Sequence, residues 1–280
     1  LVKHPKVKAV GFTGSFIGGS ALQESIFKRA EPIPFFAEMS SINPIALLPG
    51  ALKEKQDEIA KKITASIVLG TGQFCTQPGL LLVIADKKTD EFIETLGRLL
   101  SKMGQQGMIH PDLIENYLRQ SEKLNGLKGS IVVQERKDKI QDKQVTPKLS
   151  QISGEQFLAN PIYQEEVFGP FSLVVKCKNL EELEQVVKSL KGQLTGGIFA
   201  QPSDYELMDP LVTAFQSKVG RFLFNDVPTG VEVSAAMTHG GPFPSTTDSR
   251  FTAVGPASIY RWVRPITYQN WPEDLFDKLV

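Results

Sequence analysis

Cysteine and histidine are scarce in this chain of 280 residues. Its two cysteines, Cys75 and Cys177, are too few and too far apart for a disulfide framework or a CxxC site. The three histidines, His4, His110 and His239, are scattered along the sequence, so no metal site is predicted. Because no disulfides are expected, the predicted setting is a reducing, cytoplasmic one.

Long apolar runs and an excess of one charge are lacking too. The longest apolar runs, such as GLLLVIA (79–85), are far too short to span a bilayer, so no membrane association is predicted. Lys plus Arg number 31, as do Asp plus Glu, so no net positive charge points to nucleic acid as a partner. Residues 1–15 lack an initiator Met and a signal peptide's features, which indicates that the chain begins inside a larger protein.

Strand-like and helix-like segments alternate along the sequence. Short apolar runs predict strands at 6–12, 79–85, 129–134, 171–177, 195–201 and 219–226. Apolar residues at helical spacing, with capping residues, predict helices at 51–70, 89–103, 111–124, 179–192 and 203–216, the last interrupted near Pro210. This order predicts an α/β fold with a largely parallel sheet flanked by helices.

The remaining segments are predicted as loops and a tail strand. The charged run 137–144 and the stretch 238–251, rich in Gly, Pro, Ser and Thr, are expected to be loops. Residues 258–269 alternate polar with apolar residues, as an edge strand does. Because unpaired edges favour association, we expect this strand to pair with another subunit of a homo-oligomer.

Two stretches could position a ligand or a base. In FTGS (12–15), a strand runs into Gly14 and Ser15 before a helix, and such helix starts attract phosphate. An ordinary turn with Ser15 as the helix cap is the alternative. In FFAEMSSINP (35–44), apolar neighbours predict partial burial of Glu38, which would raise its pKa towards the range of a general base. Alternatively, the serine turn satisfies this carboxylate.

Two further stretches suggest a nucleophile and an acidic site. In GTGQFCTQPG (70–79), Cys75 has polar neighbours between glycine-rich turns, unlike a buried structural thiol. A thiol becomes a strong nucleophile when a base takes its proton, yet no histidine partner for Cys75 is identifiable from the sequence. In YQEEVFGPF (163–171), paired carboxylates precede Val–Phe–Gly–Pro, and an acidic surface turn is the alternative.

Taken in order, FTGS, AEMSSINP, GQFC and EEVFGP resemble the motifs of the aldehyde dehydrogenase superfamily, with matching spacing over nearly the whole chain. The resemblance implies that Cys75 attacks an aldehyde carbonyl. It implies that Glu38 activates the water that hydrolyses the resulting thioester. The substrate is then a small-molecule aldehyde, and the oxidant is NADP or NAD. The family's oxyanion hole uses an asparagine that would lie upstream of residue 1.

The resemblance also implies a cofactor site. Gly14 and Ser15 match the turn that faces the cofactor. Glu166 matches the carboxylate that holds the nicotinamide ribose, and Phe168 matches the aromatic residue beside it. Three regions are expected from the same resemblance. They are the end of a cofactor-binding domain (1–37), a catalytic domain (38–240), and a tail with the oligomerisation strand (241–280).

A narrower resemblance comes from three variants of the family pattern. Met39–Ser40–Ser41 after the glutamate, EPIPFF before it and RWVRPITYQNWP near the end resemble the branch containing α-ketoglutaric semialdehyde (2,5-dioxovalerate) dehydrogenases. Fatty-aldehyde oxidisers of the same branch remain an alternative. An acylating enzyme that uses coenzyme A is a second one, which Glu38 disfavours. A catalytically silent domain that acts only in folding and assembly is a third.

Overall fold

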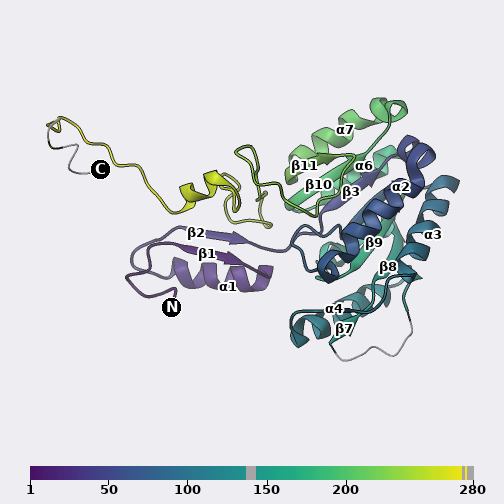
Figure 1. Cartoon of the computed structure of the whole chain (residues 1–280), viewed down its shortest axis with the longest axis horizontal. Coiled ribbons are helices and arrows are strands. Elements are labelled where there is room, and N and C mark those ends of the chain that lie inside the picture. Colours follow the sequence, from purple (N-terminus) through teal and green to yellow (C-terminus); the bar gives the residue numbers. More distant parts are fainter. Residues whose placement is uncertain (137–142, 273–274, 276–280) are drawn as a thin grey trace.

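A seven-stranded sheet forms the framework of the molecule (Figure 1). The structure is a computed structural model and describes residues 1–136, 143–272 and 275. The strand order is β11-β10-β3-β4-β9-β8-β6, and neighbours are parallel except for the antiparallel pair β6–β8. The strands are β3 (Pro44–Leu47), β4 (Leu80–Ile84), β6 (Ile131–Gln134), β8 (Lys148–Ser153), β9 (Phe171–Cys177), β10 (Gln193–Phe199) and β11 (Val219–Phe224).

Helices cover both faces of this sheet, which confirms the predicted α/β architecture. Alternation along β4 sends Leu80 and Leu82 into one core and Leu81 and Val83 into the other, as a strand buried on both faces requires. The core of Leu81 and Val83 is closed by α2 (Pro49–Val68) and α3 (Lys87–Ser101). The opposite core is closed by α4 (Pro111–Asn125), α5 (Gly154–Ala159), α6 (Leu180–Ser189) and α7 (Tyr205–Gln216).

The first residues form a small unit beside the large sheet (Figure 1). Strands β1 (Val10–Thr13) and β2 (Phe35–Glu38) pair in parallel in a sheet of their own, and α1 (Phe16–Phe27) connects them. Glu38 ends β2, at the position where we predict the boundary between the cofactor-binding and catalytic domains. The three domain ranges remain predictions.

The smaller elements complete the described chain. A two-stranded antiparallel sheet joins β5 (Gln106–Gly107) to β7 (Gln144–Val145). The 3-10 helices are η1 (Leu69–Gly72), η2 (Pro161–Gln164), η3 (Pro202–Asp204) and η4 (Pro256–Arg261). Most of the predicted charged loop 137–144 lies outside the described residues. No helix in the described part of the chain has the length and apolar character needed to cross a membrane.

Two sequence predictions about individual elements are wrong. Helix α7 is continuous through Pro210, because the missing N–H costs one hydrogen bond near the helix start while Leu211 and Phe215 anchor the helix in the core. The predicted strand 258–269 is absent: η4 occupies its beginning, and residues 263–269 have no regular structure. A lone edge strand lacks the partner that would satisfy its backbone groups. Pairing of this segment with another subunit remains a prediction.

Candidate active site

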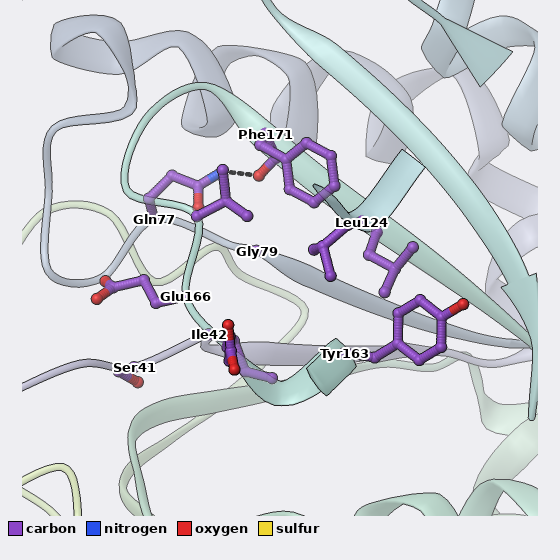
Figure 2. Close-up of a pocket in the computed structure, with 11 residues that line it drawn as sticks. Ser41, Ile42, Gln77, Gly79, Leu124, Tyr163, Glu166 and Phe171 are labelled. Carbon is purple, nitrogen blue, oxygen red and sulfur yellow. Dashed lines mark hydrogen bonds between the residues drawn. The ribbon is translucent and has the colours of Figure 1, made fainter. Parts of the chain in front are cut away.

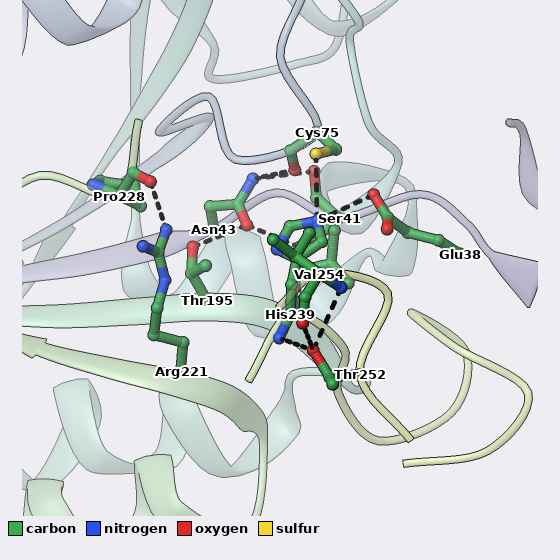
Figure 3. A network of polar contacts seen from close by, with 11 residues as sticks. Glu38, Ser41, Asn43, Cys75, Thr195, Arg221, Pro228, His239, Thr252 and Val254 are labelled. Atoms are coloured by element: carbon green, nitrogen blue, oxygen red, sulfur yellow. Dashed lines mark hydrogen bonds and ion pairs between the residues drawn. The ribbon is translucent and has the colours of Figure 1, made fainter. Parts of the chain in front are cut away.

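The two predicted catalytic residues lie together with a third side chain (Figure 3). The Nε2 atom of His239 lies 3.4 Å from the Sγ atom of Cys75 and 3.1 Å from the Oε1 atom of Glu38. Glu38 and His239 are buried, whereas Cys75 is partly exposed. The sequence identified no histidine partner for Cys75, and the structure corrects this: His239 is that partner.

The cysteine loop is shaped by three consecutive residues with positive φ. Gly70, Thr71 and Gly72 have φ angles of 54°, 59° and 65°. At Gly72, an added Cβ would lie 2.3 Å from the carbonyl carbon of Gly169, so only glycine fits. This contact brings the Cys75 loop against the loop that carries Glu166.

Asn43 fixes the other side of the cysteine loop. Its backbone is left-handed, with a φ of 46°. Its Nδ2 atom donates to the carbonyl oxygens of Cys75 and Gln77, each at 2.9 Å. Its Oδ1 atom accepts a hydrogen bond of 2.8 Å from the hydroxyl of Thr195 on β10. Asn43 is therefore a positioning residue, and the only local signal for it is an Asn–Pro pair just before a buried strand.

The long loop 238–251, predicted as such, brings His239 to the site. It runs beside β2, where Met39 N–H donates to the Ser245 carbonyl at 2.8 Å. The backbone of His239 is held on both sides, since its N–H donates to Thr252 Oγ1 at 2.9 Å and its carbonyl accepts from Ala253 N–H at 2.8 Å. The sequence signal for this histidine is its place before two glycines in a loop, but its closeness to Cys75 depends on the folded chain.

The electrostatics differ from the sequence prediction at Glu38. Burial raises the pKa of Glu38, as predicted, but the hydrogen bond and charge of His239, the hydrogen bond of Cys75 and the charge of Arg261 together hold that pKa below its ordinary value. Burial and the nearby Glu38 carboxylate raise the pKa of Cys75 to about 12. At neutral pH, Glu38 is thus a carboxylate and Cys75 is a thiol. The carboxylate is a base, and it lies beside the thiol, which is a weak acid. A proton can move from sulfur to the Glu38 carboxylate when sulfur bonds to carbon.

The residues predicted to contact a cofactor lie next to the cluster of Glu38, Cys75 and His239. They are joined to it by hydrogen bonds to Glu38 and Ser40. Gly14 N–H donates to the Glu38 carbonyl at 3.1 Å. Ser15 caps α1, because its hydroxyl oxygen accepts from Gly18 N–H at 3.1 Å. Ser40 Oγ accepts from Phe16 N–H at 3.3 Å. The turn before α1 is therefore joined to the end of β2.

Glu166 lies on the opposite side of Ser40. The Ser40 hydroxyl and the Ser41 N–H donate to its carboxylate, but burial raises the pKa of Glu166 to about 7. Figure 2 shows Glu166 at the edge of a small pocket that Ser41 and Gln77 also line. Phe168 follows in the same loop and is partly exposed. Glu166 and Phe168 remain candidates for the nicotinamide end of a cofactor, and Glu38, Cys75 and His239 are the candidate ligands for a metal ion.

The chain belongs to the aldehyde dehydrogenase family, whose pattern it matches over residues 1–262. It is 42% identical over 275 residues to alpha-ketoglutaric semialdehyde dehydrogenase 2 of Azospirillum brasilense, a match that covers 98% of this chain and 52% of that protein. It is 41% identical over 271 residues to alpha-ketoglutaric semialdehyde dehydrogenase of Acinetobacter baylyi, covering 96% and 52% respectively. The chain thus spans about half the length of these curated relatives.

Solved structures share the fold. Methylmalonate-semialdehyde dehydrogenase from Oceanimonas doudoroffii superposes with a TM-score of 0.77 at 19% identity, covering 97% of this chain and 56% of that one. A 1-pyrroline-5-carboxylate dehydrogenase from Thermus with bound NAD gives a TM-score of 0.72 at 19% identity, covering 91% and 49%.

Proposed function

We propose that this chain carries the catalytic part of an NAD(P)-dependent aldehyde dehydrogenase, which oxidises an aldehyde to a carboxylate through a thioester on Cys75. The observation that carries the proposal is the contact of Cys75 Sγ and the Glu38 carboxylate with the same nitrogen, His239 Nε2, at 3.4 and 3.1 Å. A nucleophile within reach of a base, and a base held by a third group, form the arrangement that thiol catalysis requires.

The first step forms the bond between sulfur and carbon. Cys75 is a thiol at neutral pH, so its proton must leave as Sγ attacks the aldehyde carbon, and the ionised Glu38 carboxylate, which is hydrogen-bonded to this thiol, receives the proton. The carbonyl π electrons move to oxygen, which gives the alkoxide of a thiohemiacetal. Glu166 and Phe168 would hold a nicotinamide cofactor, which would supply the hydride acceptor for oxidation of this adduct to a thioester.

The second step releases the acid. Glu38 is ionised at neutral pH because its pKa lies below its ordinary value, so it can remove a proton from water. The water oxygen bonds to the thioester carbon, the carbon–sulfur bond breaks, and the sulfur regains a proton. An enzyme that transfers its acyl group to coenzyme A does not need such a base, so Glu38 favours hydrolysis.

The residues around Ser40 fit the cofactor role that the resemblance implies. Glu166 offers a carboxylate for the ribose hydroxyls, and Ser40 links it to the start of α1. Gly14 and Ser15 would face the cofactor from that turn, and Phe168 would pack beside its nicotinamide end. Either NADP or NAD is compatible with these positions.

We further propose 2,5-dioxovalerate as substrate and 2-oxoglutarate as product. The support is the identity of 42% and 41% to two alpha-ketoglutaric semialdehyde dehydrogenases over nearly the whole chain. Assembly as a homo-oligomer and a cytoplasmic setting, in which Cys75 stays reduced, belong to the same proposal.

The test uses the protein that contains this chain, assayed for reduction of NADP and NAD with 2,5-dioxovalerate. We expect Glu38→Gln to permit the first hydride transfer and to slow hydrolysis, which gives a burst of reduced cofactor followed by a low steady rate. Glu54→Gln, at an exposed position on α2, is the matched control. Unchanged turnover in Glu38→Gln, or a product that forms only with coenzyme A, contradicts the proposal.

A further inference from the structure

We propose that Glu38, Cys75 and His239 also form a three-ligand site for Zn²⁺, and that Zn²⁺ bound there blocks the enzyme reversibly. Each side chain offers one ligand atom, and these atoms lie within 4.8 Å of one another. The binding depends only on this cluster. The block of catalysis also rests on the proposed function of Cys75.

Two of the three separations between the ligand atoms are close to those at a tetrahedral ion, and the third, between Cys75 and Glu38, is within 4.8 Å. Zinc binds thiolate sulfur at about 2.3 Å, and imidazole nitrogen or carboxylate oxygen at about 2.1 Å, which places S and N about 3.6 Å apart and N and O about 3.4 Å apart. The observed Sγ–Nε2 and Nε2–Oε1 separations are 3.4 and 3.1 Å. Small outward movements of the three side chains would therefore admit the ion, and its fourth position would stay open to water, as at other three-ligand zinc sites.

The charges at the cluster also suit a divalent cation. The ionised Glu38 and a Cys75 thiolate supply two negative charges, and a neutral His239 adds none, so the buried site becomes neutral with the ion in place. Without a metal, Glu38 disfavours the thiolate; a bound cation reverses this and displaces the thiol proton.

The surrounding charges and the released proton set a pH dependence. Glu166, whose pKa is about 7, adds a negative charge near Cys75 when it ionises, while Arg221 and Arg261 place positive charges near Cys75 and Glu38 respectively. Because binding releases the proton of Cys75, the affinity for Zn²⁺ should increase with pH.

The ligand types select the ion and limit its affinity. Mg²⁺ and Ca²⁺ prefer shells of oxygen ligands, whereas a thiolate with an imidazole favours Zn²⁺. A zinc-bound histidine usually donates its other ring N–H to an acceptor, and the loss of such a partner weakens binding by about 10- to 100-fold. His239 Nδ1 is buried and has no hydrogen-bond partner among the described residues. We therefore expect reversible binding that a chelator removes.

Binding is tested on the chain itself, without aldehyde or cofactor. Titration calorimetry should show one Zn²⁺ per chain and no heat with Mg²⁺, and Co²⁺ used as a probe should give a thiolate-to-metal charge-transfer band. His239→Gln and Glu38→Gln should each weaken Zn²⁺ binding at least tenfold, whereas His4→Gln, at an exposed position, should leave it unchanged. Circular dichroism checks that each variant is folded.

Two outcomes would overturn the zinc site, and a third would overturn its inhibitory role. The absence of the Co²⁺ band in the unmodified chain excludes thiolate ligation, whether or not the variants fold. Equal Zn²⁺ affinity in the unmodified chain and both variants indicates capture by the thiol alone. If Zn²⁺ binds as expected yet leaves aldehyde oxidation by the protein containing this chain unaffected, the inhibitory role is wrong and the site stands. If the protein containing this chain does not oxidise the aldehyde even without Zn²⁺, the proposed function is wrong, and the zinc site is judged by the binding measurements alone.

Discussion

His239 contributes to the ionisation of the neighbouring Glu38. Glu38 is buried, and burial alone would raise the pKa of its carboxyl. The hydrogen bond and charge of His239, with smaller contributions from Cys75 and Arg261, reverse the direction of that shift. The carboxylate that the proposed hydrolytic step requires is thus maintained in part by a residue from a loop about 200 positions further along the chain.

Replacing this histidine should move the pH profile of turnover. In His239→Gln, the largest opposition to burial is lost, so the pKa of Glu38 should rise. With Glu38 in its proposed role as the ionised base, activity in the variant should be lost at a higher pH as the pH falls. Steady-state rates measured across pH in the protein containing this chain check this, with His4→Gln as control. If the low-pH side of the rate profile is the same in His239→Gln as in the unmodified protein, His239 does not control the ionisation of Glu38.

Cys75 should be alkylated faster than Cys177, and the rate of alkylation of Cys75 should increase with pH. Cys75 is partly exposed, whereas Cys177 is fully buried in the core at the end of β9. Since the pKa of Cys75 is raised to about 12, its thiolate fraction should increase roughly tenfold per pH unit across the neutral and mildly alkaline range. Alkylation with iodoacetamide followed by peptide mass mapping measures both rates. Preferential labelling of Cys177, or a plateau well below the raised pKa, would contradict this.

The sequence identified Cys75 and Glu38 as candidates for nucleophile and base, but not the histidine that contacts both, and the reason is physical. Cys75 and Glu38 each lie in a short motif, and the residues next to them in the sequence indicate a loop around Cys75 and partial burial of Glu38. His239 and Asn43 act through contacts between segments distant in the sequence, and nothing adjacent to them marks those contacts. The direction of the pKa shift at Glu38 was wrong for the same reason, because the opposing charge comes from His239.

At the scale of elements, the cysteine loop is held by backbone geometry as much as by side chains. The turn at 70–72 is left-handed, Gly72 rests against the backbone of Gly169, and Asn43 binds two carbonyls of the loop. Such a conformation costs free energy in any residue with a Cβ, so the surrounding contacts must maintain it.

Gly72→Ala should therefore destabilise the chain and displace Cys75. The new Cβ would lie 2.3 Å from Gly169, at a φ of +65°. We expect a loss of about 2 to 4 kcal/mol in the free energy of unfolding, from strain together with overpacking. Urea unfolding measures it. Gly104→Ala is the matched control, since its Cβ would meet nothing within 4 Å. Equal effects of the two substitutions would show that the close approach at Gly72 is unimportant.

A second feature at the scale of elements is the ion pair between the buried Lys148 and the partly exposed Glu135. The Lys148 side chain on β8 is 4% exposed, and its ammonium lies 2.7 Å from Glu135 and 3.1 Å from the Ser121 hydroxyl. Glu135→Gln leaves that buried cation without its counter-charge, so we expect a loss of about 3 kcal/mol in stability. Replacing the cation too, in Glu135→Gln with Lys148→Met, should recover much of it in urea unfolding. A double variant less stable than the single one would oppose this account.

For the molecule as a whole, the order of helices and strands along the chain could be predicted from the sequence. The order of the strands within the sheet could not. Alternating strands and helices predicted a parallel sheet, because parallel strands need crossovers of this length. The arrangement β11-β10-β3-β4-β9-β8-β6 depends on which faces pack together, and no local pattern encodes that. The tail prediction failed similarly. Alternation predicted a strand at 258–269, yet a strand forms only where another strand can accept its hydrogen bonds.

The tail should nevertheless serve association. Val263, Ile266 and Tyr268 are exposed on a segment that extends away from the sheet (Figure 1), and water-exposed apolar side chains in sequence favour a protein partner. We expect Ile266→Asp, or Ile266→Pro, to lower the mass measured by light scattering, because either change opposes pairing or burial of this segment. Ile109→Asp, which places the same charge at an isoleucine that is 86% exposed elsewhere, should leave the mass unchanged. If Ile266→Asp and Ile109→Asp behave alike, the tail does not hold the subunits together.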